Sequence, residues 1–124
     1  KVWLAEAHHK LGLAWVGKGH HEKAKTEMLQ SLVIRPNTPE ILNNLGTVYS
    51  KLGDKANALA SFEKAVTLRP NYAIARYNLA EAYEPSNPRR ALSEYETYLA
   101  LVEGIPDEAN RIAQVQQRVK TLKQ

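Results

Sequence analysis

TPEILNNLGTVYSKLGDKANALASFEKAVTLRPN, residues 38–71, is the stretch that decides the fold. Its features recur on both sides at one fixed interval. Equivalent residues stand 34 positions apart, as in Leu11, Leu45 and Leu79, and in the aromatic residues Trp15, Tyr49 and Tyr83. A fixed period of this length is typical of stacked repeat architectures. The sequence therefore predicts one structural unit, written three times.

Residues 38–71 themselves predict two helices joined by a turn. Thr38 and Pro39 suit an N-cap and the first helical position. The first helix then carries an apolar stripe at spacings of three, four and seven, and Gly53 turns the chain. The stripe consists of Leu42, Leu45, Gly46 and Tyr49, and the returning helix presents Ala58, Phe62 and Ala65. Because Gly46 and Ala58 are small, we expect the two helix backbones to approach closely at these residues.

The other two copies follow the same plan with local departures. In the first copy, a helix is expected to end near Gly19, and a second helix runs from about His21 to Ile34 before Pro36 stops it. In the third copy, Asn71 is expected to cap the first helix, and the turn at 84–88 is one residue shorter. Asn87 and Pro88 re-form an N-cap and first-position pair in front of the last helix of this copy.

A final helix is expected at residues 107–123, with Asp107 as its N-cap. Its apolar residues form one narrow stripe, consisting of Ile112, Val115, Val119 and Leu122. A helix that is apolar on one side and polar on the other suits the open end of a stack of repeats. We interpret it as a capping helix in preference to a partner-binding or membrane-surface helix.

Composition limits the possible function classes. The chain has 124 residues, 44% hydrophobic and 24% charged, which are ordinary globular values, and it has no cysteine and no apolar run long enough to span a membrane. The net charge of +4 is spread over helix faces of mixed sign, so we expect no nucleic-acid partner. The chain begins with Lys1. We interpret it as a piece of a longer, soluble protein, cytoplasmic or periplasmic, whose targeting signal is not in this sequence.

No set of residues indicates catalysis, and no cofactor or metal is expected. The pairs His8-His9 and His20-His21 lie about 18 Å apart along a helix, much farther than two ligands of one ion. No serine lies in a Gly-flanked elbow, and no glycine-rich phosphate loop is present. His8 is expected to be a half-buried packing residue.

With these residues in place, the second copy resembles the tetratricopeptide repeat at all eight signature positions of that family: Leu42, Leu45, Gly46, Tyr49, Ala58, Phe62, Ala65 and Pro70. The first and third copies are similar with departures, among them Met28, Tyr98 and Glu103. The resemblance implies an all-α fold, a right-handed α-solenoid, in a single domain at 1–124. Its repeats would lie at about 5–38, 39–72 and 73–105, followed by the capping helix at 107–123.

The resemblance also implies a concave groove, lined mainly by the first helix of each pair, that binds a peptide or partner segment. The residues expected to line this groove are His9, Leu13, Val16, Asn43, Asn44, Thr47, Tyr77, Asn78 and Glu81. Asn44 and Asn78 occupy places where similar proteins use an amide to bond a peptide backbone. Some members clamp a terminal carboxylate, but only Asn44 fits that pattern, so a mixed, partly apolar ligand is expected.

The sequence therefore favours a non-catalytic protein–protein interaction module. The alternative is a structural module that self-associates, or docks within a larger protein, through the apolar segment Val2-Trp3-Leu4.

Overall fold

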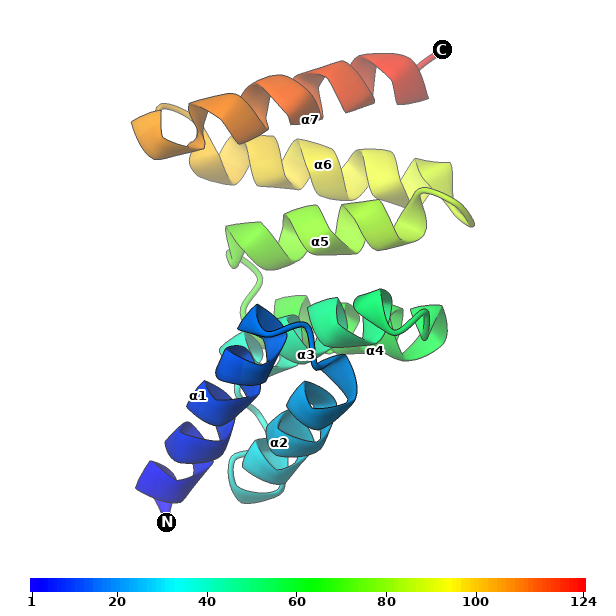
Figure 1. Cartoon of the computed structure of the whole chain (residues 1–124). Coiled ribbons are helices and arrows are strands. Elements are labelled where there is room, and N and C mark those ends of the chain that lie inside the picture. Colours follow the sequence, from blue (N-terminus) through cyan, green and yellow to red (C-terminus); the bar gives the residue numbers. More distant parts are fainter. The chain divides into compact units, whose positions relative to one another are not determined.

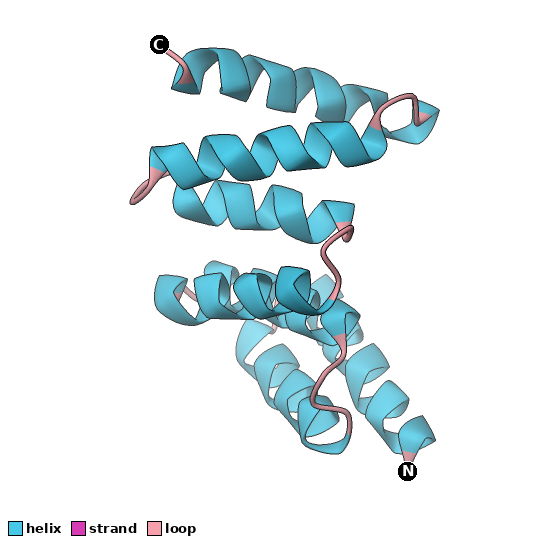
Figure 2. Ribbon diagram, turned by 180° about the vertical axis from the view of Figure 1, so that it is seen from behind, coloured by secondary structure: helices cyan, strands magenta, loops and turns pink.

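The computed structural model describes all residues from 1 to 124. It contains seven α-helices, one short 3-10 helix and no strand (Figures 1 and 2). The helices divide into two compact units, Lys1–Pro70 and Asn71–Gln124. The predicted fold class is confirmed, because three helix-turn-helix pairs are followed by one final helix.

The first unit consists of two helix pairs. Its helices are α1 (Val2–Gly17), α2 (His21–Ile34), α3 (Pro39–Lys51) and α4 (Lys55–Leu68). Gly19 and Gly53 close the two pairs with φ of 79° and 80°, a left-handed conformation that glycine adopts without a steric penalty. After the second turn, the side chain of Asp54 caps α4 by accepting a hydrogen bond from the Asn57 amide.

The two helices of each pair meet where one residue is small. A Cβ on Gly12 would lie 2.9 Å from Cγ of Met28, and a Cβ on Gly46 would lie 2.6 Å from Cε1 of Phe62. The contact predicted at Gly46 is therefore present, although its partner is the ring of Phe62. Ser31 adds a buried hydrogen bond to the first pair by donating to the carbonyl oxygen of Ala5 at 2.6 Å.

The core of the first unit lies between its two pairs. Its buried residues come from α2 and α3, and they are Ala24, Met28, Ile41, Leu45 and Val48. Leu45 is 3% exposed, whereas its equivalent Leu11 in the first copy is 46% exposed. Leu45 is covered because α2 packs on the side of α3 that bears it, where Ala24 and Met28 lie.

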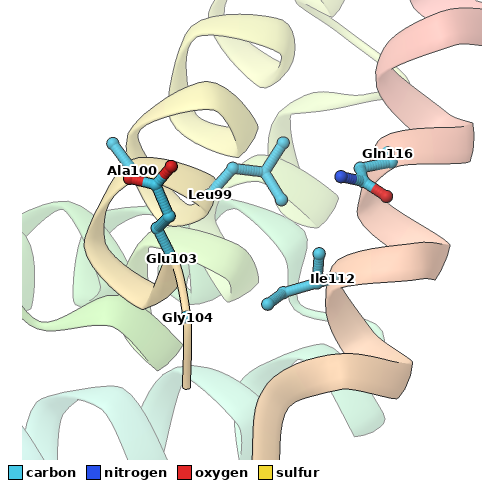
Figure 3. Close-up of a pocket in the computed structure, with 6 residues that line it drawn as sticks. All are labelled: Leu99, Ala100, Glu103, Gly104, Ile112 and Gln116. Carbon is cyan, nitrogen blue, oxygen red and sulfur yellow. The ribbon is translucent and has the colours of Figure 1, made fainter. Parts of the chain in front are cut away.

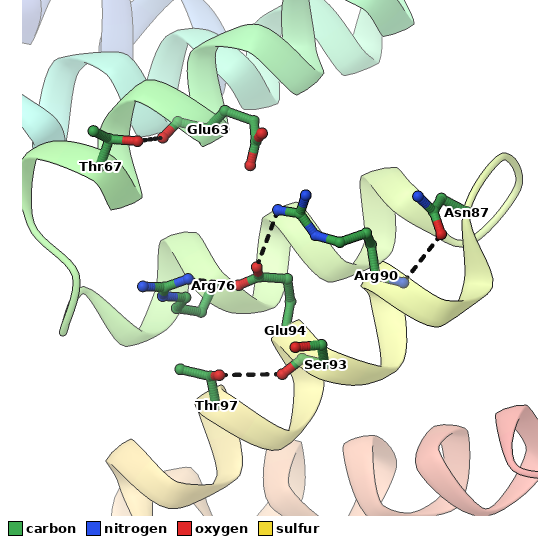
Figure 4. Close-up of polar contacts among 8 residues, drawn as sticks. All are labelled: Glu63, Thr67, Arg76, Asn87, Arg90, Ser93, Glu94 and Thr97. Atoms are coloured by element: carbon green, nitrogen blue, oxygen red, sulfur yellow. Dashed lines mark hydrogen bonds and ion pairs between the residues drawn. The ribbon is translucent and has the colours of Figure 1, made fainter.

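The second unit consists of one helix pair and the final helix, which lie side by side in antiparallel order (Figure 1). Its elements are α5 (Ala73–Tyr83), α6 (Pro88–Val102), the 3-10 helix η1 (Pro106–Glu108) and α7 (Ala109–Leu122). The predicted cap at Asn87 is confirmed, because its Oδ1 accepts a hydrogen bond from the Arg90 amide at 3.2 Å (Figure 4).

A buried carboxylate joins α5 to α6. Glu94 is only 5% exposed, accepts a hydrogen bond from Arg76 at 2.9 Å and pairs with Arg90 at 3.5 Å (Figure 4). A buried carboxylate needs such partners to offset the loss of hydration. Glu94 therefore holds the third pair together from the side of α6.

Two predicted helix starts differ from the structure, and a third start is confirmed without its side-chain cap bond. Asn71 does not cap α5, which begins at Ala73 without a side-chain cap. Asp107 lies inside η1, and α7 begins two residues later, because Pro106 starts a 3-10 turn first. Thr38 does precede α3, but its hydroxyl donates backward to the carbonyl of Arg35 at 3.0 Å and makes no cap bond.

Tyr98 ties the final helix to the third pair. It is fully buried, and its hydroxyl donates to Glu108 at 2.6 Å, while Arg111 of α7 donates to the same carboxylate oxygen at 3.0 Å. Burial and this carboxylate raise the pKa of Tyr98 to about 12. Of the predicted apolar stripe of α7, Val115 is fully buried and the other three residues are half-buried.

The contact at Gly46 predicts a difference between two glycine substitutions. Gly46→Ala is expected to lower the free energy of unfolding by about 1–3 kcal/mol, because Phe62 is buried and cannot move aside. Gly17→Ala, also in a helix, meets no atom within 4 Å and is expected to raise it by up to about 1 kcal/mol. Urea unfolding of both variants checks this, and equal effects would contradict the assigned contact.

Candidate peptide-binding surface

In the first unit, two of the predicted groove residues meet across α1 and α3. Nδ2 of Asn44 donates to Nε2 of His9 at a distance of 2.9 Å. Burial lowers the pKa of His9, and the nearby carboxylates of Glu40 and Glu6 oppose that shift without cancelling it. The neutral imidazole is therefore favoured, and it accepts the hydrogen bond from the amide.

Leu13, Val16 and Thr47 differ in how much surface they offer. Leu13 is 42% exposed, whereas Val16 is half-buried and packs against the core between α2 and α3. Thr47 is half-buried, and its hydroxyl donates to the carbonyl of Asn43 at 3.3 Å. Among the predicted groove residues of this unit, Leu13 is thus the exposed apolar side chain, and it is accompanied by partly exposed amide, imidazole and hydroxyl groups.

Asn43 does not belong to the exposed row in which the spacing of three and four placed it. Its side chain is buried, with 5% exposure. The cause lies in the packing of α3, which has α2 on one side and α4 on another and buries six of its thirteen residues. The strip of α3 that solvent reaches is therefore narrower than the sequence pattern indicates.

In the second unit, Tyr77 lies at the centre of an aromatic cluster. Its ring centroid is 5.7 Å from that of Tyr98 and 6.2 Å from that of Tyr95, and the Arg111 guanidinium lies 5.3 Å from the ring. The Tyr77 hydroxyl donates to Glu81 at 3.0 Å, and burial together with this carboxylate raises the pKa of Tyr77. Glu81 is exposed on α5, and Asn78 on the same helix is half-buried.

Tyr77 and Glu81 help to line a pocket of about 540 Å³ that the sequence did not predict. We call it the α5–α7 pocket. Its lining residues come from three helices, and they are Tyr77, Glu81, Glu84, Tyr95, Gln114, Val115, Gln117 and Arg118. One feature of the sequence could have indicated this pocket: the spacing of Gln114, Gln117 and Arg118 places three polar side chains on one face of the final helix.

One carboxylate holds the α5–α7 pocket together. Glu84 forms an ion pair with Arg118 of α7 and accepts a hydrogen bond from the Tyr95 hydroxyl at 2.5 Å. Burial alone would raise the pKa of Glu84, but the hydrogen bonds from Arg118 and Tyr95 outweigh it and lower the pKa below its ordinary value. Glu84 is therefore ionised at neutral pH and neutralised by Arg118.

A second pocket, of about 500 Å³, lies between α6 and α7 (Figure 3). Leu99 of α6 faces Ile112 and Gln116 of α7 across the gap, and Glu103 and Gly104 lie at the end of α6. None of these residues belongs to a first helix of a pair.

Nowhere in the chain do three His, Asp or Glu side chains gather closely enough to share a metal ion. No helix combines the length and the apolar composition needed to cross a bilayer.

The chain consists of antiparallel helix pairs that repeat every 34 residues, and the two helices of a pair approach each other at a small residue. These features define a helical-repeat protein. Residues 39–72 match the family described as Tetratricopeptide repeat, so this part of the chain is such a repeat. The whole chain has the fold of solved tetratricopeptide-repeat domains. The first such domain of RPAP3, solved with an HSP90 peptide, has a TM-score of 0.83 and 20% identity, over 97% of this chain and 96% of that chain.

Two further similar proteins are bacterial. The type III secretion chaperone SycD of Yersinia enterocolitica, solved with a peptide of the translocator YopD, has a TM-score of 0.89 at 16% identity, over 95% of this chain and 91% of that chain. Cellulose synthase operon protein C of Escherichia coli K12 is 38% identical in an alignment 95 residues long, which covers 64% of this chain. The match spans only 8% of that protein.

The His9–Asn44 pair predicts a dependence of stability on pH. Because the pKa of His9 in the folded chain lies below its ordinary value of 6.5, the unfolded chain binds this proton more readily. The resulting stability is present above pH 6.5 and is lost as the pH falls through the folded pKa. We therefore expect the melting temperature of His9→Gln to fall less than that of the parent between about pH 7.5 and about pH 5.5.

The matched control is His8→Gln, which removes the neighbouring histidine and its contact with Glu27 but leaves His9 in place. This control should keep the part of the pH dependence that His9→Gln removes. Parallel melting curves for the parent and His9→Gln would show that His9 does not contribute.

Proposed function

We propose that residues 1–124 act as one non-catalytic protein–protein interaction domain, which binds an extended peptide or partner segment along the first helices of its pairs. The observation that carries this proposal is in the first unit. Leu13 stands exposed on α1, and Asn44 and Thr47 lie partly exposed on α3, while six of the thirteen residues of α3 are buried. An apolar side chain beside amide and hydroxyl groups suits a peptide, which has both side chains and a polar backbone.

The comparisons support the same kind of function. SycD and the first RPAP3 domain, which share the fold, were both solved with a bound peptide. A surface built from packed helices is already ordered before a ligand arrives, so little conformational entropy is lost on binding.

The expected ligand is partly apolar. A clamp for a terminal carboxylate needs cationic side chains. The equivalent positions here hold Leu13, Ile74 and His9, and the lowered pKa of His9 favours its neutral form. Asn44 fits such a clamp by residue type, but its amide already donates to His9. In the second unit, Tyr77, Asn78 and Glu81 would contact the ligand from α5.

A variant at Leu13 tests this proposal. Twelve-residue peptides are selected from a display library on the intact chain, and Leu13→Asp is expected to weaken binding of the selected peptides by about tenfold, the effect of one apolar contact. Leu29→Asp is the matched control, because Leu29 is 39% exposed, close to the 42% of Leu13, but lies on the second helix of its pair. Equal losses, or NMR shifts confined to α2 and α4, would sink the proposal.

A second candidate function is self-association through α1, and one observation favours it. Trp3 is 72% exposed and Val2 is 59% exposed, close to the exposed Leu4 and Leu11 on the same helix. Exposed apolar clusters of this kind are characteristic of protein–protein contacts.

Self-association predicts a dimer that depends on concentration and that Trp3→Ser weakens by about tenfold or more, since a large buried aromatic residue would be lost from the interface. Sedimentation velocity over a concentration series measures this. A monomer at every concentration would rule out the second candidate and leave the first unaffected.

A further inference from the structure

We propose that the α5–α7 pocket binds a basic side chain, lysine or arginine, of the peptide ligand. This inference rests on the proposed function and adds the chemistry of one ligand residue. It assigns a part in binding to α7, the helix that the sequence indicated only as a cap.

The charges that line the pocket leave one carboxylate without a counter-ion. Three lining residues are charged, namely Glu81, Glu84 and Arg118. Glu84 and Arg118 form an ion pair and neutralise each other. Glu81 is exposed and receives only the neutral hydroxyl of Tyr77. The lining residues of the pocket therefore carry a net charge of −1, and a cation would complement it.

The walls suit the long stem of a basic side chain. Val115 is fully buried beneath the pocket, and the rings of Tyr77 and Tyr95 form its aromatic side. Lysine and arginine bury their methylene stems along such surfaces while the charged head reaches a polar group at the rim. Gln114 and Gln117 add amides that can both donate to and accept from a ligand backbone.

An acidic ligand side chain would find no free cation here. Arg118 is held by both carboxylate oxygens of Glu84. Arg111, which lies over the Tyr77 ring, is held by Glu108. Binding an anion would require breaking one of these pairs, whereas binding a cation at Glu81 leaves both intact.

The test uses two blocked pentapeptides, one with a central lysine and its twin with norleucine, which keeps the four-carbon stem without the charge. Each is titrated into the intact, ¹⁵N-labelled chain. The lysine peptide is expected to shift the amides of residues 77–84 and 114–118, and to bind about fivefold more tightly than the norleucine peptide.

Two variants locate the effect. Glu81→Gln removes the charge at the pocket and should make the two peptides bind equally. Glu103→Gln removes an exposed carboxylate from the neighbouring α6–α7 pocket and should leave the fivefold difference unchanged. Both side chains are exposed, so circular dichroism should show the parent fold in both variants.

Equal affinity of the two peptides for the parent, loss of the difference in Glu103→Gln, or the absence of shifts at residues 77–84 and 114–118 would each overturn the inference. These results are separable from failure of the proposed function. Display-selected peptides that lose affinity in Leu13→Asp would keep the proposed function even if the lysine peptide does not distinguish the pocket.

Discussion

The first unit depends on the close approach of the two helices within each of its pairs. Gly12 lies against Met28 and Gly46 against the ring of Phe62, at distances that leave no room for a Cβ without movement of the neighbour. This approach lets α3 bury six residues while it packs on both α2 and α4. That packing fixes the positions of Asn44 and Thr47 on α3. The candidate binding surface is therefore positioned by the same contacts that form the core.

The fold could be predicted from the sequence because its determinants are local and repeated. The 34-residue interval, the turns at Gly19 and Gly53, and the cap at Asn87 all appear in the structure as expected. The starts of α5 and α7 could not be predicted, because a residue favourable for capping does not fix where the backbone enters a helix. Pro106 begins a 3-10 turn, and this moves the start of α7 beyond Asp107.

The candidate site was less accessible to sequence reasoning, since it depends on contacts between helices. Spacing correctly placed His9 and Asn44 on facing helices but could not show that they would bond to each other. It placed Asn43 in solvent, although packing on two sides buries that residue. The α5–α7 pocket was missed because its lining residues come from three different helices, and residue spacing within one helix does not show which helices meet.

The ion pair between Glu84 and Arg118 bridges α5 and α7, so it sets how firmly the final helix is held over the pocket. Arg118 is exposed, and attraction between exposed charges weakens as dissolved ions accumulate around them. Ionic strength would therefore act on the spacing of these two helices, while the hydrogen bond from the buried Tyr98 to Glu108 secures the other end of α7. The C-terminal part of α7 can therefore change its distance from α5 more easily than the N-terminal end can.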